Sequence, residues 1–163
     1  MVMSQSKWQL AEERARKTAR WATIMTRWRI AFATNGRRVG AKAVPPSRRW
    51  ELVGFPGPKG RESRGIVDLV AIRKNHGPCS APFNRGDLLE MVLIQIKGGS
   101  ARMPTVTDIR RLRAVQKRYA AKAVLLAAWK RGAQPTFFQL QSGKTRVPAR
   151  ANWTPVDPGL IFR

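Results

Sequence analysis

RGIVDLVAIRKN (residues 64–75) decides the fold, together with GDLLEMVLIQIKGG (residues 86–99), which follows it after a loop. Both runs are rich in Val, Ile and Leu and are bounded by Gly, Asn and Pro, a pattern typical of paired strands buried on both faces. Each run also carries polar residues: Asp68 in the first, Gln95 and Lys97 in the second. A buried carboxylate or ammonium costs several kcal/mol unless it is paired or bound to a metal. These three residues are therefore candidates for a functional site.

The spacing of these residues predicts which face of a sheet they occupy. Side chains alternate between the two faces of a strand, so Gln95 and Lys97 share a face with Leu93, and Glu90 points to the other. If the two strands are neighbours in a hairpin, Asp68 stands beside Gln95 and Lys97.

The composition indicates a polyanionic partner. The chain has 163 residues with 32 Lys and Arg, 9 Asp and Glu, and a formal net charge of +23. Such an excess attracts nucleic acid first and an anionic membrane surface second. No apolar run approaches the roughly 18 residues that span a bilayer.

The remaining chain predicts two helices and three further strands. We expect helices at 6–33 and 104–122 and strands at 50–55, 123–129 and 136–141. The first helix should turn an apolar stripe to the sheet, made of Trp8, Ala11, Ala15, Ala22, Met25, Trp28 and Phe32. Thr105 or Thr107 caps the second helix, and Asp108 suits its positive end.

This order of elements predicts an α/β domain over residues 1–141, with the N-terminal helix at 6–33 and the sheet and second helix within 50–141. The C-terminal segment, residues 142–163, has little periodicity. It is either a tail packed on the surface through Trp153 and Ile161-Phe162 or a disordered segment.

The pair of strands resembles the catalytic hairpin of the PD-(D/E)XK nuclease superfamily, which includes restriction endonucleases, Holliday junction resolvases and VRR-type nucleases. The matching segments are GIVD (residues 65–68) and QIKG (residues 95–98). Two residues depart from the family pattern, Val67 where Pro is frequent and Gln95 where Glu is usual. The resemblance covers residues 6–141 and implies an αβββαβ restriction-endonuclease-like core, a mixed sheet flanked by helices with a long basic helix at the N-terminus.

The resemblance also implies a reaction and a metal. It predicts Mg²⁺-dependent (or Mn²⁺-dependent) hydrolysis of phosphodiester bonds in DNA, including branched or structured DNA. Asp68, the side-chain carbonyl of Gln95 and the backbone carbonyl of Ile96 would hold the ion with water. Lys97 would orient the attacking hydroxide and stabilise the phosphate.

A second acid should complete this site, and the sequence leaves several candidates. Glu51 is favoured because its strand should adjoin that of Asp68. The resolvase-like alternative is an acid on the first helix, Glu12 or Glu13. In VRR-type relatives a Gln of the second helix faces the metal, which corresponds here to Gln116.

Cations on both helices and in the connector before the first strand are the predicted contacts to the nucleic-acid backbone, with Trp21 available for stacking. They are Arg14, Arg16, Lys17, Arg20, Arg27, Arg37, Arg38, Arg48, Arg49, Arg110, Arg111 and Lys117.

Two other functions compete with the nuclease: a non-catalytic nucleic-acid-binding protein with a degenerate nuclease fold, and a basic RNA-binding protein. We favour DNA over RNA. Resolvase-like members are often dimers, so a homodimer stays open. The single Cys79 fits a reducing cytosol, and the absence of an apolar leader segment favours a cytoplasmic or nucleoid-associated protein, with organellar import left open. A zinc clip at His76 and Cys79 is disfavoured, because zinc needs four ligands.

Overall fold

The computed structural model describes residues 7–35, 49–55, 65–75, 77–78 and 80–162. Its elements are α1 (Lys7–Asn35), β1 (Glu51–Gly54), β2 (Leu69–Lys74), β3 (Leu89–Gly98), α2 (Val106–Arg118), β4 (Ala123–Trp129), β5 (Thr136–Leu140), the 3-10 helix η3 (Ala149–Asn152), β6 (Trp153–Pro155) and α3 (Pro158–Ile161). None of the described helices is long and apolar enough to cross a membrane.

The described strands form one sheet of six strands in the order β1-β2-β3-β4-β5-β6. All neighbours are antiparallel except β3 and β4, which run parallel because α2 carries the chain back between them. The predicted α/β class, the long N-terminal helix, the mixed sheet and the pairing of the first two strands are confirmed.

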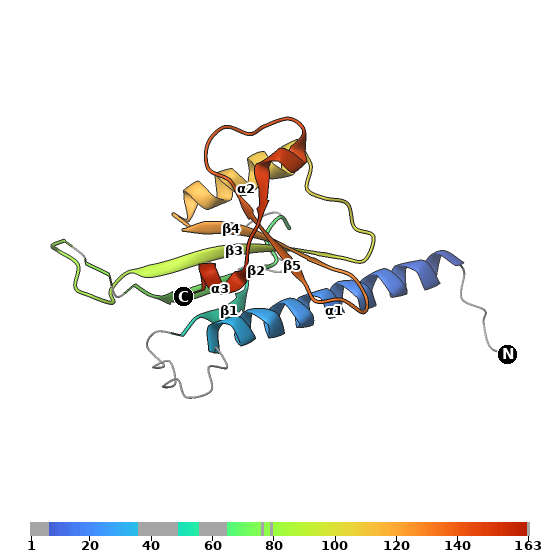
Figure 1. The fold of residues 1–163 in the computed structure, drawn as a ribbon, viewed down its shortest axis with the longest axis horizontal. Coiled ribbons are helices and arrows are strands. Elements are labelled where there is room, and N and C mark those ends of the chain that lie inside the picture. The colour runs from blue at the N-terminus through green and yellow to red at the C-terminus, as the bar shows by residue number, and fades with distance from the viewer. Residues whose placement is uncertain (1–6, 36–48, 56–64, 76, 79, 163) are drawn as a thin grey trace.

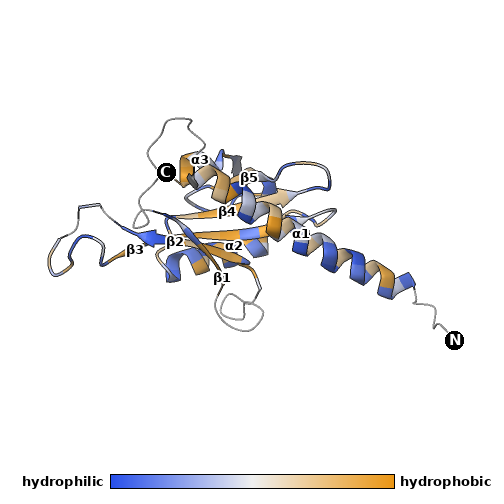
Figure 2. Cartoon of the chain, turned by 90° about the horizontal axis from the view of Figure 1, so that it is seen from below, coloured by the Kyte–Doolittle hydropathy of each residue, from blue (hydrophilic) through white to orange (hydrophobic). Residues whose placement is uncertain are grey.

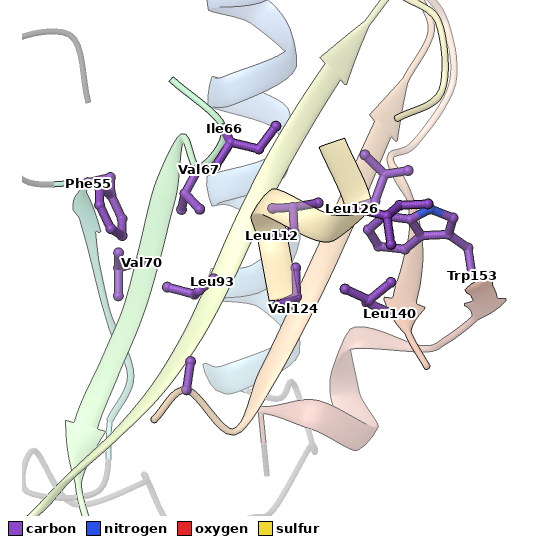
Figure 3. Packing of buried hydrophobic residues seen from close by; sticks show 12 residues of the cluster. Phe55, Ile66, Val67, Val70, Leu93, Leu112, Val124, Leu126, Leu140 and Trp153 are labelled. Carbon is purple, nitrogen blue, oxygen red and sulfur yellow. The ribbon is translucent and has the colours of Figure 1, made fainter. Parts of the chain in front are cut away.

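The two long helices lie on opposite faces of the sheet (Figure 1). On the α2 face, Val70, Leu93, Val124 and Leu126 pack beneath Leu112 of the helix (Figure 3). A second cluster fills the other face, where Ile30 of α1 joins residues such as Leu69, Val92 and Leu125. Burial on both faces explains why β3 and β4 read as almost continuous apolar runs.

The second helix is shorter than predicted because both of its ends are fixed locally. Thr105, one of the two predicted caps, is the N-cap and forms a capping box with Asp108. After Arg118, Ala120 adopts a φ of 49°, a left-handed conformation that ends the helix.

The first helix turns to the sheet only part of the predicted stripe. Ala22 is fully buried as predicted, and so are Thr26 and Ile30, whereas Trp28 and Phe32 are 52% and 46% exposed. Trp28 and Phe32 are each two residues from Ile30, about 200° around the helix, so they lie on its other side. At Gly98 the backbone of β3 approaches α1 so closely that only a small residue such as Ala22 fits. Toward its N-terminus the helix projects beyond the sheet (Figure 2), which leaves Trp8 exposed.

The C-terminal segment is packed against the rest of the chain. β6 pairs with β5, and Trp153 lies in the core beneath α2. Phe162 lies in the core on the α1 face, where its ring meets that of Trp50 edge-on at 5.4 Å. β6, η3 and α3 were not predicted, because their segment has neither a helical nor a strand period.

Replacing Gly98 by Ala should destabilise the fold. A Cβ there would lie 2.9 Å from Ala22 Cβ and 3.1 Å from the Thr18 carbonyl oxygen. We expect Gly98→Ala to lower the free energy of unfolding by about 1–3 kcal/mol, as overpacking does. In Gly54→Ala, the matched control in β1, the added Cβ meets nothing within 4 Å. Equal denaturation midpoints for the two variants would contradict the packing of α1 on β3.

Candidate active site

Asp68 lies at an irregularity where β2 begins. Its backbone N–H donates to the Ile94 carbonyl oxygen at 2.9 Å, although Leu69 is the register partner of Ile94. Two residues opposite one is the arrangement of a β-bulge, which redirects a side chain. The Asp68 Oδ2 atom accepts a hydrogen bond from the Ile96 N–H at 2.6 Å. The carboxylate is therefore held against β3, one residue from both Gln95 and Lys97.

Gln95 and Lys97 occupy the α2 face of β3, as predicted. Leu93, two residues earlier, belongs to the core beneath α2, and alternation puts Gln95 and Lys97 on the same side. Gln95 is only 4% exposed, and its Oε1 atom has no hydrogen-bond partner in the described part of the chain. A buried amide oxygen without a partner costs about 1–3 kcal/mol. Such an atom is well suited to bind a cation.

The pKa of the Asp68 carboxyl is raised, because nearby protein atoms make its charged form less favourable. Asp68 is exposed, so the expectation of a buried carboxylate is wrong, because the residue lies before β2 begins. Nearby protein atoms still remove part of its hydration, and this effect on the pKa is the largest. The Ile96 N–H and the charge of Lys97 act in the opposite direction and offset it only in part. A divalent cation would remove the penalty, because it stabilises the ionised form.

Asp108 approaches the same ammonium from the start of α2. Its Oδ2 atom accepts from the Thr105 N–H at 3.0 Å. This hydrogen bond is the main reason that the pKa of Asp108 is lowered, and the charge of Lys97 contributes. The predicted role as a helix cap is confirmed. The sequence did not reveal that Asp108 also lies within range of the charge of Lys97, because their separation depends on where α2 crosses the sheet.

The acids predicted to complete the site lie elsewhere. Glu51 pairs in register with Ile72, four residues along the sheet from the row of Asp68, which corresponds to ~13 Å at strand rise. One ion cannot contact both carboxylates. Glu12 and Glu13 form ion pairs with Arg16 and Lys17 on the part of α1 that extends beyond the sheet (Figure 2). Neither reaches Asp68.

Gln116 is also absent from the site. Its Nε2 donates to the Ala121 carbonyl oxygen at 3.2 Å and so helps to end α2. The helix rises ~12 Å between Asp108 and Gln116. Gln116 therefore lies at the C-terminal end of α2, whereas the N-terminal end is the one near Lys97. Within the described residues, no three His, Cys, Asp or Glu side chains gather where they could hold a metal.

Most of the predicted phosphate contacts in the described part of the chain are exposed. These are Arg14, Arg16, Lys17, Arg20, Arg27, Arg49, Arg110 and Lys117. Trp21 is 55% exposed and accessible for stacking. Arg111 is half-buried, 3.8 Å from Asp108. Arg37, Arg38 and Arg48, like His76 and Cys79, lie outside the described residues.

Comparison of the chain with protein-family models, with curated proteins and with solved structures finds no match.

Asp68→Asn should stabilise the protein at neutral pH. A carboxyl whose pKa is raised by folding favours the folded state fully below its ordinary pKa of about 4, and this contribution is lost as the pH rises through the folded value. We expect a gain of about 0.5 kcal/mol or less at pH 7, which disappears at low pH. Asp108→Asn should do the opposite at pH 7, since its pKa is lowered. Urea denaturation at pH 7 and pH 3.5 measures the stability of both variants. A loss of stability in Asp68→Asn at pH 7 would contradict the raised pKa of Asp68.

Proposed function

We propose that the protein is a metal-dependent endonuclease that hydrolyses phosphodiester bonds in DNA, including branched or structured DNA. One observation supports the proposal: the Asp68 carboxylate accepts from the N–H of Ile96, the residue between Gln95, whose buried amide oxygen has no partner in the described part of the chain, and Lys97, whose charge acts on Asp68. The order of the elements supports it, since α1, β1, β2, β3, α2 and β4 follow one another as in the αβββαβ core of PD-(D/E)XK nucleases.

The available donors suit Mg²⁺ or Mn²⁺. Both prefer oxygen ligands, and Mg²⁺ is commonly held by one or two carboxylates together with substrate phosphate and water. The Asp68 carboxylate and Gln95 Oε1 are the side-chain donors, and the carbonyl of Ile96 is the nearby backbone donor. Because only one of these carries a charge, binding should be weak without nucleic acid.

The roles follow from the contacts. A bound Mg²⁺ would supply an activated water and neutralise charge on the phosphate. Asp68, fixed by the Ile96 N–H, would hold the ion in a constant place relative to β3. The charge of Lys97 acts on both the Asp68 and the Asp108 carboxyl, so its ammonium would stabilise negative charge that develops on a phosphate bound there.

The charge of the chain supports a nucleic-acid substrate. With a formal charge of +23, the protein should bind a polyanion over a wide surface. The exposed cations of α1 and α2 are placed to contact phosphates on either side of the sheet. Affinity from such contacts falls steeply with salt and does not depend on the metal.

A second candidate is a nucleic-acid-binding protein that has lost cleavage. Among the described residues, Asp68 is the one carboxylate among the proposed metal ligands, where two acids are usual in the family, and this feature favours the second candidate. A basic RNA-binding protein would rest on charge alone.

Asp68→Ala and Lys97→Ala should abolish cleavage and leave affinity for DNA within about twofold, because a single residue adds little to so large a cationic surface. The assay is cleavage of junction, flap, duplex and single-stranded DNA, and of RNA, with Mg²⁺ or Mn²⁺. Lys144→Ala, in the exposed loop after β5, is the charge-matched control and should cleave normally. Wild-type cleavage that survives unchanged in chelator, or in Asp68→Ala, would refute the proposal.

Gln95→Glu should keep or strengthen the binding of Mg²⁺, since it adds a second anionic ligand beside Asp68. The measurement is the metal concentration that gives half-maximal cleavage, together with the shift in melting temperature on adding Mg²⁺. If the variant loses both responses while remaining folded, Gln95 does not contact the ion.

A further inference from the structure

A pocket of about 550 Å³ adjoins the candidate active site on the α2 face of the sheet. Lys97 belongs to both. In the strand register Lys97, Ala128 and Thr136 stand side by side on β3, β4 and β5, and all three line the pocket. The volume lies within the range of about 300–1,000 Å³ that is usual for small-molecule sites.

Aromatic residues form one side of this pocket. Phe138 of β5 and Trp153 of β6 both line it, and both also touch the core beneath α2. They are therefore fixed rather than mobile. The indole Nε1 of Trp153 is buried without a hydrogen-bond partner in the described part of the chain. Because this nitrogen has almost no accessible surface, the indole offers the pocket flat apolar surface and no hydrogen-bond donor.

The charged residues of the lining have one sign. Lys97, Lys130 and Arg150 contribute to it, and no Asp or Glu of the described residues does. Lys130 and Arg150 are exposed, whereas Phe138 and Trp153 pack against the core. The occupant that fits is a flat aromatic group joined to an anion.

Building on the proposed nuclease, we infer that this pocket binds an unstacked nucleobase of the strand whose phosphate lies at Lys97. Bases stack on aromatic side chains whatever their sequence, and the phosphate of the same nucleotide suits the cations of the lining. A base paired inside a duplex cannot enter. The pocket therefore selects nucleic acid with unpaired nucleotides near the scissile phosphate, as at flaps, branches and single strands.

Thr136→Trp tests the inference by filling the pocket. Thr136 is exposed at the start of β5 and its side chain shares the face of Phe138, and an aromatic residue suits a strand position. Thr154→Trp is the matched control: Thr154 is exposed on the neighbouring strand and pairs with Gln139, whose side chain points to the other face. The full-length proteins are titrated in chelator, by fluorescence anisotropy, against labelled oligo(dT), a strand of abasic nucleotides of equal length, and duplex DNA.

The wild type and Thr154→Trp should bind oligo(dT) about tenfold more tightly than the abasic strand, the usual size of one stacked base. Thr136→Trp should bind the two strands alike, near the abasic value, and should bind duplex as the wild type does. Ala133→Trp, which fills the pocket from the turn after β4, serves if Thr136→Trp does not fold. Unchanged binding of oligo(dT) by a folded pocket variant, or an equal loss for duplex, would overturn the inference. The inference would also be overturned if filling the pocket abolished the binding of free thymidine monophosphate and left the binding of oligo(dT) unchanged, because the pocket would then be a site for free nucleotides.

The metal plays no part in these titrations, so they are separate from the test of the nuclease. A protein that fails to cleave but shows the base-dependent difference refutes the reaction and keeps the pocket. A protein whose cleavage depends on Asp68 but that binds oligo(dT) and the abasic strand alike keeps the reaction and refutes the pocket.

Discussion

The hydrogen bond from the Ile96 N–H to the Asp68 carboxylate determines how the site is built. Where β2 begins, the regular pairing with β3 gives way to a bulge, and the side chain takes over a donor of the neighbouring strand. This contact fixes the acid beside Gln95 and Lys97, and it also keeps the carboxylate where the protein removes part of its water. The same local arrangement thus places the acid and makes it favourable for a cation to bind there.

Elements on both faces of the sheet pack around the place where Asp68 meets β3. On one face, α1 can approach β3 closely because Gly98 has no side chain. On the other, the capping box of α2 fixes Asp108 near enough to Lys97 for that charge to help lower the pKa of the Asp108 carboxyl. Beyond β4 the same face opens into the pocket lined by Phe138 and Trp153. A phosphate at Lys97 would therefore have the candidate metal ligands on one side and an aromatic surface on the other.

The sequence predicted what depends on local pattern and missed what depends on packing. The alternation around Leu93, Gln95 and Lys97 fixed their face, and the threonine before α2 identified its cap. Glu51 was misplaced because the pattern shows that two strands pair but not their register, and a shift of a few residues moves a side chain by ~13 Å. The apolar stripe of α1 was misjudged in part because large aromatic residues were expected to be buried, whereas the buried side is that of Ala22 and Ile30 and the aromatic residues lie on the other side. The pocket could not be foreseen, since Trp153 lies in a segment without periodicity.

The central claim is that Asp68 and Gln95 bind one divalent cation beside Lys97. Crystals of the protein soaked in Mn²⁺ test it most directly, because anomalous scattering locates the ion without assumptions about activity. The account predicts a peak in contact with both the Asp68 carboxylate and Gln95 Oε1, with the Lys97 ammonium nearby, and no such peak in crystals of Asp68→Ala. An empty site in the wild type, with Gln95 Oε1 hydrogen-bonded to a protein group, would contradict it.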